Sequence, residues 1–128
     1  MSNIAVRVTP DALRQIRRGS PWVYDGSITS ASREGAPGDL AVIFDSGRKF
    51  AAVGLWDPTS PIRVKVLHHG KPTTIDAQFW RTRLAAARDR RSGLAGDPDT
   101  TGYRLVHGEN DQLPGFVADR YGATVVVK

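Results

Sequence analysis

The chain has 128 residues, of which 40% are hydrophobic and 24% charged, so it has room for one or two small domains and is too apolar to be disordered. It has no cysteine, which excludes disulfides, thiolate metal sites and a cysteine nucleophile within these residues. No apolar run approaches the roughly 18 residues of a membrane-spanning helix, and the first residues lack the layout of a signal peptide. We therefore expect a cytoplasmic protein without a membrane partner.

The charge balance is basic. Eighteen lysines and arginines against thirteen acidic residues give a net charge of +5, and fourteen of the eighteen are arginine. The planar guanidinium suits bidentate contacts with phosphate and stacks on bases. A basic balance favours an anionic partner, most simply a nucleic acid, although a GC-rich genome, which enriches its proteins in arginine, would give the same composition without that function. Only the positions of the arginines in the fold can distinguish a nucleic-acid-binding function from a compositional bias.

The first half of the chain has the pattern of short strands. Residues 4–8 alternate in polarity, and a short helix is predicted after them, with Thr9 as its N-cap, Pro10 at its first position and Gly19 at its end. Further strands are predicted at residues 22–29, 39–44, 50–56 and 62–68. One helix among five strands predicts a small, closed or nearly closed β-barrel over residues 1–69.

The second half changes to a helical period after a boundary at residues 69–72. A helix is predicted over about residues 74–92, capped by Thr74 or Asp76 and ended by Gly93. Its apolar stripe consists of Phe79, Trp80, Leu84 and Ala87. A hairpin is predicted over about residues 103–127, so residues 70–128 form an incomplete α+β domain and the whole chain an α+β fold. The last apolar run, Thr124–Val127, needs a partner strand, and we expect either a longer protein or a borrowed strand.

The segment from Arg17 to Tyr24 is the first candidate site. Arg17 and Arg18 stand at a helix end beside a proline-fixed turn, followed by Trp22 and Tyr24. Two cations can hold phosphates electrostatically while an aromatic ring stacks on a base, so the segment is a candidate for binding structured RNA. The alternative is that the aromatic residues fill the barrel core and the arginines only solvate a helix end.

The predicted helix carries a second basic group. Arg81 and Arg88 fall on one side of it, with Arg91 near Arg88. Such a stripe can follow an RNA backbone. A solvated helix face would have the same pattern.

The predicted hairpin is the third candidate, as a place to position a substrate base. It contains Arg104, Asp111, Asp119 and Arg120, and a carboxylate can accept from the amino group of a cytosine. The alternative is turn chemistry, with Asp119 and Arg120 as an ion pair that closes the hairpin.

Several catalytic motifs are absent from the sequence. There is no glycine-rich cofactor loop of the G-x-G-x-x-G type, no Walker loop and no nucleophile elbow. His68, His69 and His107 lack metal-ligand spacing. We expect no catalytic residue, no metal and no cofactor site in this chain.

Three segments resemble a known family. Tyr103–Gly122 matches YRLV-x-x-E-x-D-x-LPG-x-x-x-DRYG, residues 17–24 match R-R-G-x-P-W-V-[FY], and Pro58–Val64 matches P-x-S-x-I-x-V. These patterns are typical of the bacterial SAM-dependent methyltransferases that modify carbon five of cytosine in large-subunit rRNA. The departures are Ser20, where histidine is frequent, Tyr24, where phenylalanine is usual, and Gln112, where glycine is usual. Glycine often supplies a positive φ, so the backbone of the turn at Gln112 is left open.

The resemblance implies a PUA-type RNA-binding domain at residues 1–69 and the start of a central domain at residues 70–128. We therefore expect an RNA-binding and substrate-positioning region that is itself non-catalytic. Its partners would be rRNA and a catalytic domain outside this chain, with no DNA, and SAM would be the methyl donor of the full-length protein. The alternatives are a stand-alone RNA-binding module and a protein-interaction adaptor that pairs through an exposed strand edge.

Overall fold

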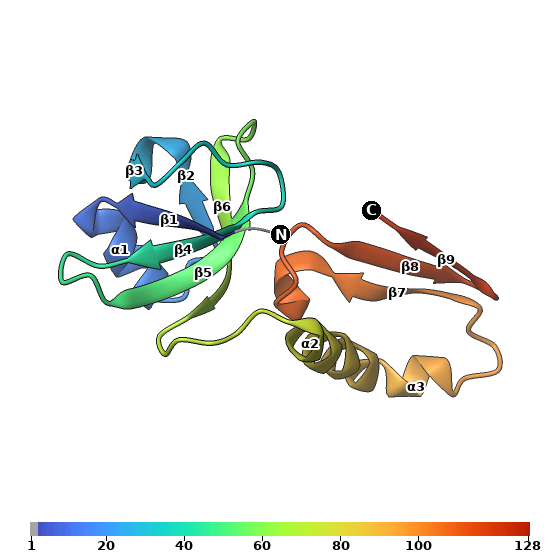
Figure 1. The fold of residues 1–128 in the computed structure, drawn as a ribbon. Coiled ribbons are helices and arrows are strands. Elements are labelled where there is room, and N and C mark those ends of the chain that lie inside the picture. The colour runs from blue at the N-terminus through green and yellow to red at the C-terminus, as the bar shows by residue number, and fades with distance from the viewer. Residues whose placement is uncertain (1–2) are drawn as a thin grey trace. The chain divides into compact units, whose positions relative to one another are not determined.

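The computed structural model describes residues 3–128, which divide into two compact units, residues 3–73 and 74–128 (Figure 1). The fold is α+β, as predicted. None of the helices formed by residues 3–128 has both the length and the apolar character needed to cross a bilayer.

The first unit is a curled six-stranded sheet with one helix. Its strands are β1 (Asn3–Val8), β2 (Trp22–Tyr24), β3 (Ile28–Ala31), β4 (Leu40–Phe44), β5 (Phe50–Trp56) and β6 (Ile62–His69). Their order in the sheet is β2-β6-β5-β4-β1-β3, and only the β1–β4 pair is parallel. Since β2 and β3 lie at opposite ends of this order, the sheet is an open half-barrel.

Helix α1 (Pro10–Arg17) packs against β2, β5 and β6 and closes the core of this unit. Ile16 is fully buried there among side chains such as Val6, Val23 and Val64. Local signals set both ends of the helix, as predicted. The Thr9 hydroxyl accepts a hydrogen bond from the Ala12 amide at 3.2 Å, and the chain leaves the helix at Gly19, whose φ is 94°.

The strand predicted at residues 22–29 is two strands. A short 3₁₀ turn, Asp25–Ser27, separates β2 from β3, and Asp25 accepts the Gly26 amide at 2.7 Å. Strand β2 pairs with β6, whereas β3 pairs with β1. The prediction was wrong because an Asp-Gly-Ser turn sends the chain to the other end of the sheet, while the polarity pattern continues through it.

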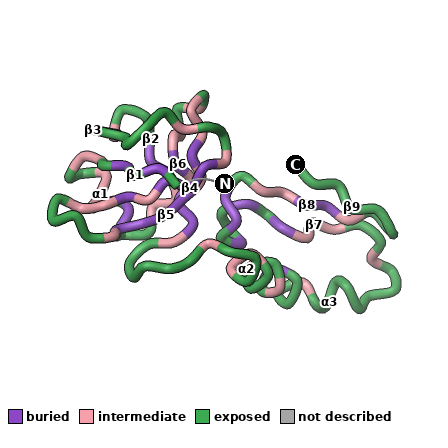
Figure 2. The backbone as a smooth tube through the Cα atoms, viewed as in Figure 1, coloured by how far each residue is buried: buried purple, intermediate pink, exposed green. Residues whose placement is uncertain are grey.

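The second unit has helices α2 (Ala77–Arg90) and α3 (Ser92–Ala95) and strands β7 (Gly102–His107), β8 (Val117–Tyr121) and β9 (Thr124–Val127). A 3₁₀ turn, η2 (Gly108–Asp111), follows β7, and the antiparallel sheet has the order β7-β8-β9. The core of the unit is small, and its members are Ala87, Val106, Leu113 and Ala118, with Trp80, Leu105 and Phe116 packed around them. Figure 2 shows exposed backbone along β9 and α3.

Two details of the predicted helix differ in the structure. Helix α2 ends at Arg90, because Arg91 leaves the helical conformation, and the one-turn helix α3 then runs past the expected stop at Gly93. Leu84, predicted for the apolar stripe, is 42% exposed, whereas Ala87 is fully buried. The Asp76 cap is confirmed, since its carboxylate accepts the Phe79 amide at 2.9 Å.

Candidate nucleic-acid interface

Arg17 and Arg18 lie at the C-terminal end of α1 and are exposed. The Arg17 side chain is 59% exposed, and its Nη2 atom lies 3.4 Å from Oδ2 of Asp45. An exposed pair of this length contributes at most about 1 kcal/mol, so a phosphate can compete for the guanidinium. The amides of Gly19 and Ser20 bond back to the carbonyls of Ile16 and Gln15, which fixes the turn after the helix.

Trp22 and Tyr24 lie on the outer face of β2. They are 40% and 52% exposed, while Val23 between them is 2% exposed and belongs to the core. This alternation follows from strand geometry, in which successive side chains point to opposite faces. The alternative interpretation that both aromatic residues fill the barrel core is therefore wrong.

The structure adds Lys65 to the predicted residues of this site. Lys65 lies opposite Trp22 in the β2–β6 pairing, so both side chains share the outer face. Arg63, two residues earlier on β6, lies 5.7 Å from the Trp56 ring centroid and 3.7 Å from Asp25. The alternation in residues 62–66 already placed Arg63 and Lys65 on the outer face.

These residues define one candidate interface in the first unit, the α1–β2 surface, made up of Arg17, Arg18, Trp22, Tyr24 and Lys65. Helix α1 packs against β2, and only the short turn at residues 19–21 separates them. The surface has three cations for phosphate oxygens and two aromatic rings for bases. Both groups are needed to hold single-stranded nucleic acid.

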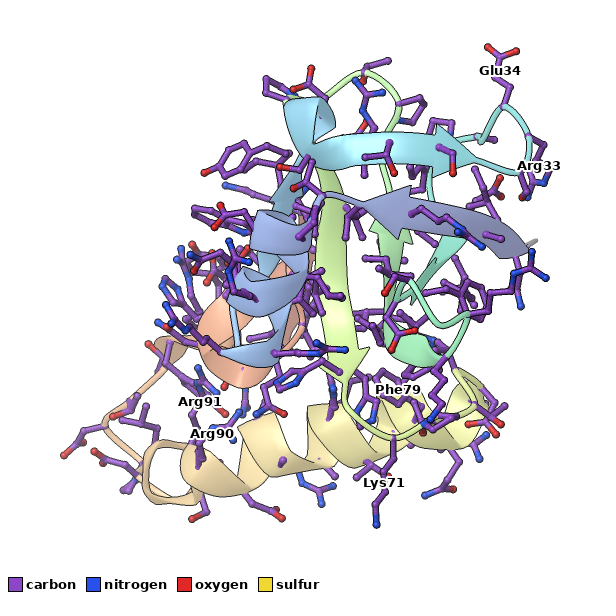
Figure 3. All side chains as sticks on the ribbon, turned by 90° about the vertical axis from the view of Figure 1, so that its left-hand side faces the viewer. Arg33, Glu34, Lys71, Phe79, Arg90 and Arg91 are labelled. Carbon is purple, nitrogen blue, oxygen red and sulfur yellow. The ribbon has the colours of Figure 1, made fainter. Side chains whose placement is uncertain are left out.

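The arginines of α2 divide into two groups. Arg81 and Arg88 are exposed, and Arg88 contacts only its exposed neighbour Asp89, at 3.4 Å. Arg90 and Arg91, labelled at one end of α2 in Figure 3, instead form ion pairs with Asp111. The predicted basic stripe therefore keeps Arg81 and Arg88, whereas Arg91 belongs to the interior of the unit.

Asp111 is 3% exposed, and its carboxylate accepts hydrogen bonds from three other residues. Arg91 donates to both carboxylate oxygens, at 3.1 and 2.8 Å, and Arg90 Nε donates to Oδ1 at 3.1 Å. The His107 amide donates to Oδ2 at 2.6 Å. Burial would raise the pKa of Asp111, but the hydrogen bonds from Arg91, Arg90 and the His107 amide outweigh it and hold the pKa well below its usual range. The carboxylate is thus an ionised, fully engaged anchor between η2 and the end of α2.

The other predicted positioning residues lie on two faces of the sheet. Arg104 and Asp119 are directly opposite each other on β7 and β8, with Nε and Oδ1 2.8 Å apart. The hydrogen bond from Arg104 lowers the pKa of Asp119, and the same bond raises the pKa of Arg104. Asp119 does not pair with Arg120, so that alternative is wrong. Arg120 follows it on the opposite face, where Nε donates to the Gly122 carbonyl at 2.8 Å and the guanidinium lies 5.8 Å from the Tyr103 ring.

The structure defines the backbone of the turn at Gln112, where the related proteins usually have glycine. It adopts the left-handed conformation, with φ 57° and ψ 32°, which glycine would take without strain. Its carbonyl accepts a hydrogen bond from Arg83, whose guanidinium also lies 4.3 Å from the Phe79 ring centroid. Burial lowers the pKa of Arg83. The turn thus keeps the glycine-like conformation with a non-glycine residue.

Within residues 3–128, no group of three or more histidine or acidic side chains is arranged to hold a metal ion.

A family model described as a PUA-like domain matches residues 6–69, half of the chain. The chain belongs to the PUA-like domain family. The matched residues include α1 and end at the last residue of β6, so they contain the whole α1–β2 surface of this PUA-like unit.

The comparison with known sequences extends beyond the PUA-like unit. A ribosomal RNA large subunit methyltransferase from Deinococcus radiodurans is 47% identical over 98% of this chain. The ribosomal RNA large subunit methyltransferase I of Erwinia tasmaniensis is 35% identical over 90% of it. These matches confirm the resemblance to rRNA methyltransferases. The chain spans only 32% and 29% of the length of these two relatives.

Solved structures share the fold at low sequence identity. A candidate SAM-dependent methyltransferase from Streptococcus mutans superimposes with a TM-score of 0.77 over 99% of this chain and 32% of its own, at 18% identity. A second structure, of a candidate methyltransferase in complex with SAH, matches with the same score and identity. At this sequence identity, both structural matches show a shared fold and nothing further.

Proposed function

We propose that this chain is the RNA-binding and substrate-positioning region of a SAM-dependent rRNA methyltransferase that acts on carbon five of cytosine. The observation that carries the proposal is the α1–β2 surface, where Trp22 and Tyr24 are exposed, Lys65 lies opposite Trp22, and the exposed Arg17 and Arg18 precede β2 by a short turn. A surface with only cations would serve any polyanion, whereas exposed rings between them suit unpaired bases. The relatives are named as ribosomal RNA methyltransferases, which supports the choice of RNA.

The catalytic steps belong to residues outside this chain. The relatives are about three times as long, and SAM would bind and react in their remaining part. In this proposal the role of residues 1–128 is to grip a structured rRNA segment and present one cytosine. Arg81 and Arg88, exposed on α2 of the second unit, would make a contact of their own with the RNA backbone.

Salt-dependent RNA binding tests the proposal. Fluorescence anisotropy with a hairpin RNA that has a single-stranded loop should show an affinity that falls steeply between about 50 and 200 mM salt, since each neutralised phosphate releases counterions. Arg17→Ala with Arg18→Ala should weaken binding to all RNA sequences alike, because phosphate contacts carry no sequence information. The slope of log affinity against log salt concentration should also fall by about two, since two phosphate contacts are lost. The matched control is Lys49→Ala with Lys71→Ala, which removes the same charge elsewhere in the first unit.

The control pair should leave most of the affinity in place. If the two double variants lose the same affinity, binding follows net charge and the α1–β2 surface has no special role. If the parent chain binds no RNA at low salt, the proposed function is wrong.

A second candidate function is strand pairing through β9. All four residues of β9 are exposed, including Val125, Val126 and Val127 at 52%, 40% and 58%, and β9 lies at the edge of its sheet. An exposed apolar edge is a template for another strand. We propose that the rest of the longer methyltransferase supplies it. Mixing the separately made C-terminal part with this chain should give a complex by size-exclusion chromatography, and a charged substitution, Val126→Lys, should weaken it.

A further inference from the structure

The outer face of β1, β3 and β4 contains a hollow of about 340 Å³. It is lined by Ala5, Val6, Arg7, Ser30, Ala31, Ser32, Phe44 and Arg48. A hollow of this size lies at the lower end of the range for small-molecule sites. None of these residues belongs to the surface proposed above for RNA.

The pairing of β1 with β3 and β4 determines which side chains line the centre of the hollow. Arg7 on β1 lies opposite Ser30 on β3 and, on its other side, opposite Phe44 on β4. Residues that are partners across neighbouring strands point to the same face, so a hydroxyl, a guanidinium and an aromatic ring stand in one row. The small side chains of Ala5 and Ser32, next along the same face, leave space beside this row.

Arg48 comes from the turn between β4 and β5, which holds it in an unusual conformation. Oδ1 of Asp45 accepts the amides of Gly47 and Lys49, each at 2.9 Å, and the Arg48 amide donates to the Asp45 carbonyl at 3.0 Å. Arg48 itself has a φ of 63°, a left-handed conformation that costs energy for any residue with a Cβ. Strained residues of this kind concentrate at binding sites, and here the residue so held is a cation at the rim of a hollow.

Neither arginine of the hollow has a partner among residues 3–128. Arg14, Arg17, Arg33 and Arg63 of the same unit each form an ion pair with an aspartate. No hydrogen bond or ion pair of the Arg7 or Arg48 side chain occurs within the described residues, and the one carboxylate of the β4–β5 turn, Asp45, is engaged by backbone amides and Arg17. Two unneutralised guanidiniums facing one hollow favour a bound anion.

We propose that this hollow binds one nucleotide of single-stranded RNA, with its phosphate held by Arg7 and Arg48 and its base stacked on Phe44. The Ser30 hydroxyl is placed to hydrogen-bond the sugar or a base edge. The aromatic ring distinguishes this site from one for phosphate alone, because base–ring stacking adds binding to a nucleotide but not to the inorganic ion. The inference rests on the proposed RNA binding and adds a second contact to it, on a different part of the sheet.

NMR titration of the parent chain locates the binding. A cytidine tetranucleotide should shift the amide signals of Arg7, Ser30 and Phe44, and cytidine 5′-monophosphate should shift the same signals more weakly. Inorganic phosphate should do so least. A mononucleotide that binds as tightly as the tetranucleotide would make free nucleotide the ligand and overturn the RNA assignment.

Two matched pairs of variants test the chemistry. Arg48→Gln, combined with Arg7→Gln, should weaken tetranucleotide binding about tenfold or more, while Lys49→Gln combined with Lys71→Gln, which removes the same charge outside the hollow, should have a much smaller effect. Phe44→Leu should weaken it about fivefold or more, and Phe50→Leu, its cross-strand neighbour outside the hollow, should change it little. Dispersed spectra of all four variants establish that they are folded.

The failures of the two proposals can be told apart. If the Arg17 and Arg18 variant loses RNA binding while the Arg7 and Arg48 variant binds like the parent, the hollow is not a nucleotide site and the proposed function stands. If the parent binds no RNA but a phosphorylated peptide shifts the hollow signals, both RNA proposals are wrong.

Discussion

Arg91 donates two parallel hydrogen bonds to the carboxylate of Asp111, from Nη1 to Oδ1 at 3.1 Å and from Nη2 to Oδ2 at 2.8 Å. The two residues are twenty positions apart, one just past the end of α2 and the other in the turn that follows β7. Because Arg90 and the His107 amide reach the same carboxylate, this one acid joins helix, strand and turn. Removing such a buried carboxylate is expected to be costly, because it leaves the two guanidiniums without their charge partner.

Asp111→Asn should destabilise the second unit by about 2–4 kcal/mol, since it removes the charge that two guanidiniums pair with in a buried position. Amide hydrogen exchange measures this where it acts, as lost protection in α2 and β7 with the first unit unchanged. The control is Asp89→Asn, which removes an exposed carboxylate from the same helix region and should cost about 0–0.5 kcal/mol. Equal protection in the two variants would contradict the anchoring role.

The same carboxylate should make the second unit sensitive to acid. The pKa of Asp111 is lower in the folded state than its unfolded value near 3.9, so it stabilises the fold above that value and the contribution is lost as the pH falls toward the folded pKa. Asp119 has a lowered pKa through Arg104 and acts in the same direction. Urea unfolding followed through the NMR signals of Val106 and Ala118 should show stability declining below about pH 4. Asp111→Asn should flatten this decline, and an unchanged slope would assign it to other groups.

Gly54→Ala should destabilise the first unit by about 1–3 kcal/mol, because the new methyl group would lie 2.4 Å from the Lys65 carbonyl oxygen and 2.7 Å from Val64 Cγ1. Strands β5 and β6 are closely apposed there, at an irregularity in their register. Urea unfolding followed by tryptophan fluorescence gives the change. Gly26→Ala is the control, since nothing lies within 4 Å of its added methyl group, and it should change stability by less than about 0.5 kcal/mol.

Features set by neighbours in sequence were predictable. Thr9, Pro10 and Gly19 define α1 because a cap, a fixed φ and a left-handed stop act within one helical turn. The alternation around Val23 likewise indicated that Trp22 and Tyr24 lie on the outer face of the sheet. Two large aromatic residues also suit a core, however, and only the pairing of β2 with its neighbouring strand distinguishes the outer face from the core.

Features set by distant residues were not predictable. The partner of Asp119 is Arg104 because strand register brings them together, whereas sequence proximity suggested Arg120. The role of Arg91 depends on Asp111, and the hollow at Arg7 depends on β1 pairing with β3 on one side and β4 on the other. A basic composition does not distinguish the arginines that are neutralised within the fold from those left to face a ligand.

Trp22→Ala should leave the first unit folded and weaken RNA binding about 5- to 100-fold, the loss of one base-stacking platform. Trp22 is 40% exposed, so its truncation should cost about 1–2 kcal/mol of stability, less than the roughly 3–5 kcal/mol expected for a core tryptophan. Trp56→Ala provides that comparison, since Trp56 is 6% exposed and lies in the core cluster. Thermal unfolding and RNA anisotropy on the same samples separate the two effects.

Trp22→Phe completes this test, because it keeps an aromatic face and should recover most of the lost affinity. Recovery by phenylalanine with the salt slope unchanged identifies stacking, since a ring neutralises no phosphate. If Trp22→Ala and Tyr24→Ala both bind RNA like the parent at a temperature where all three proteins are folded, the rings of β2 do not contact bases. The cations of the α1–β2 surface would then hold only the backbone, and the proposed presentation of a single cytosine would need a different site.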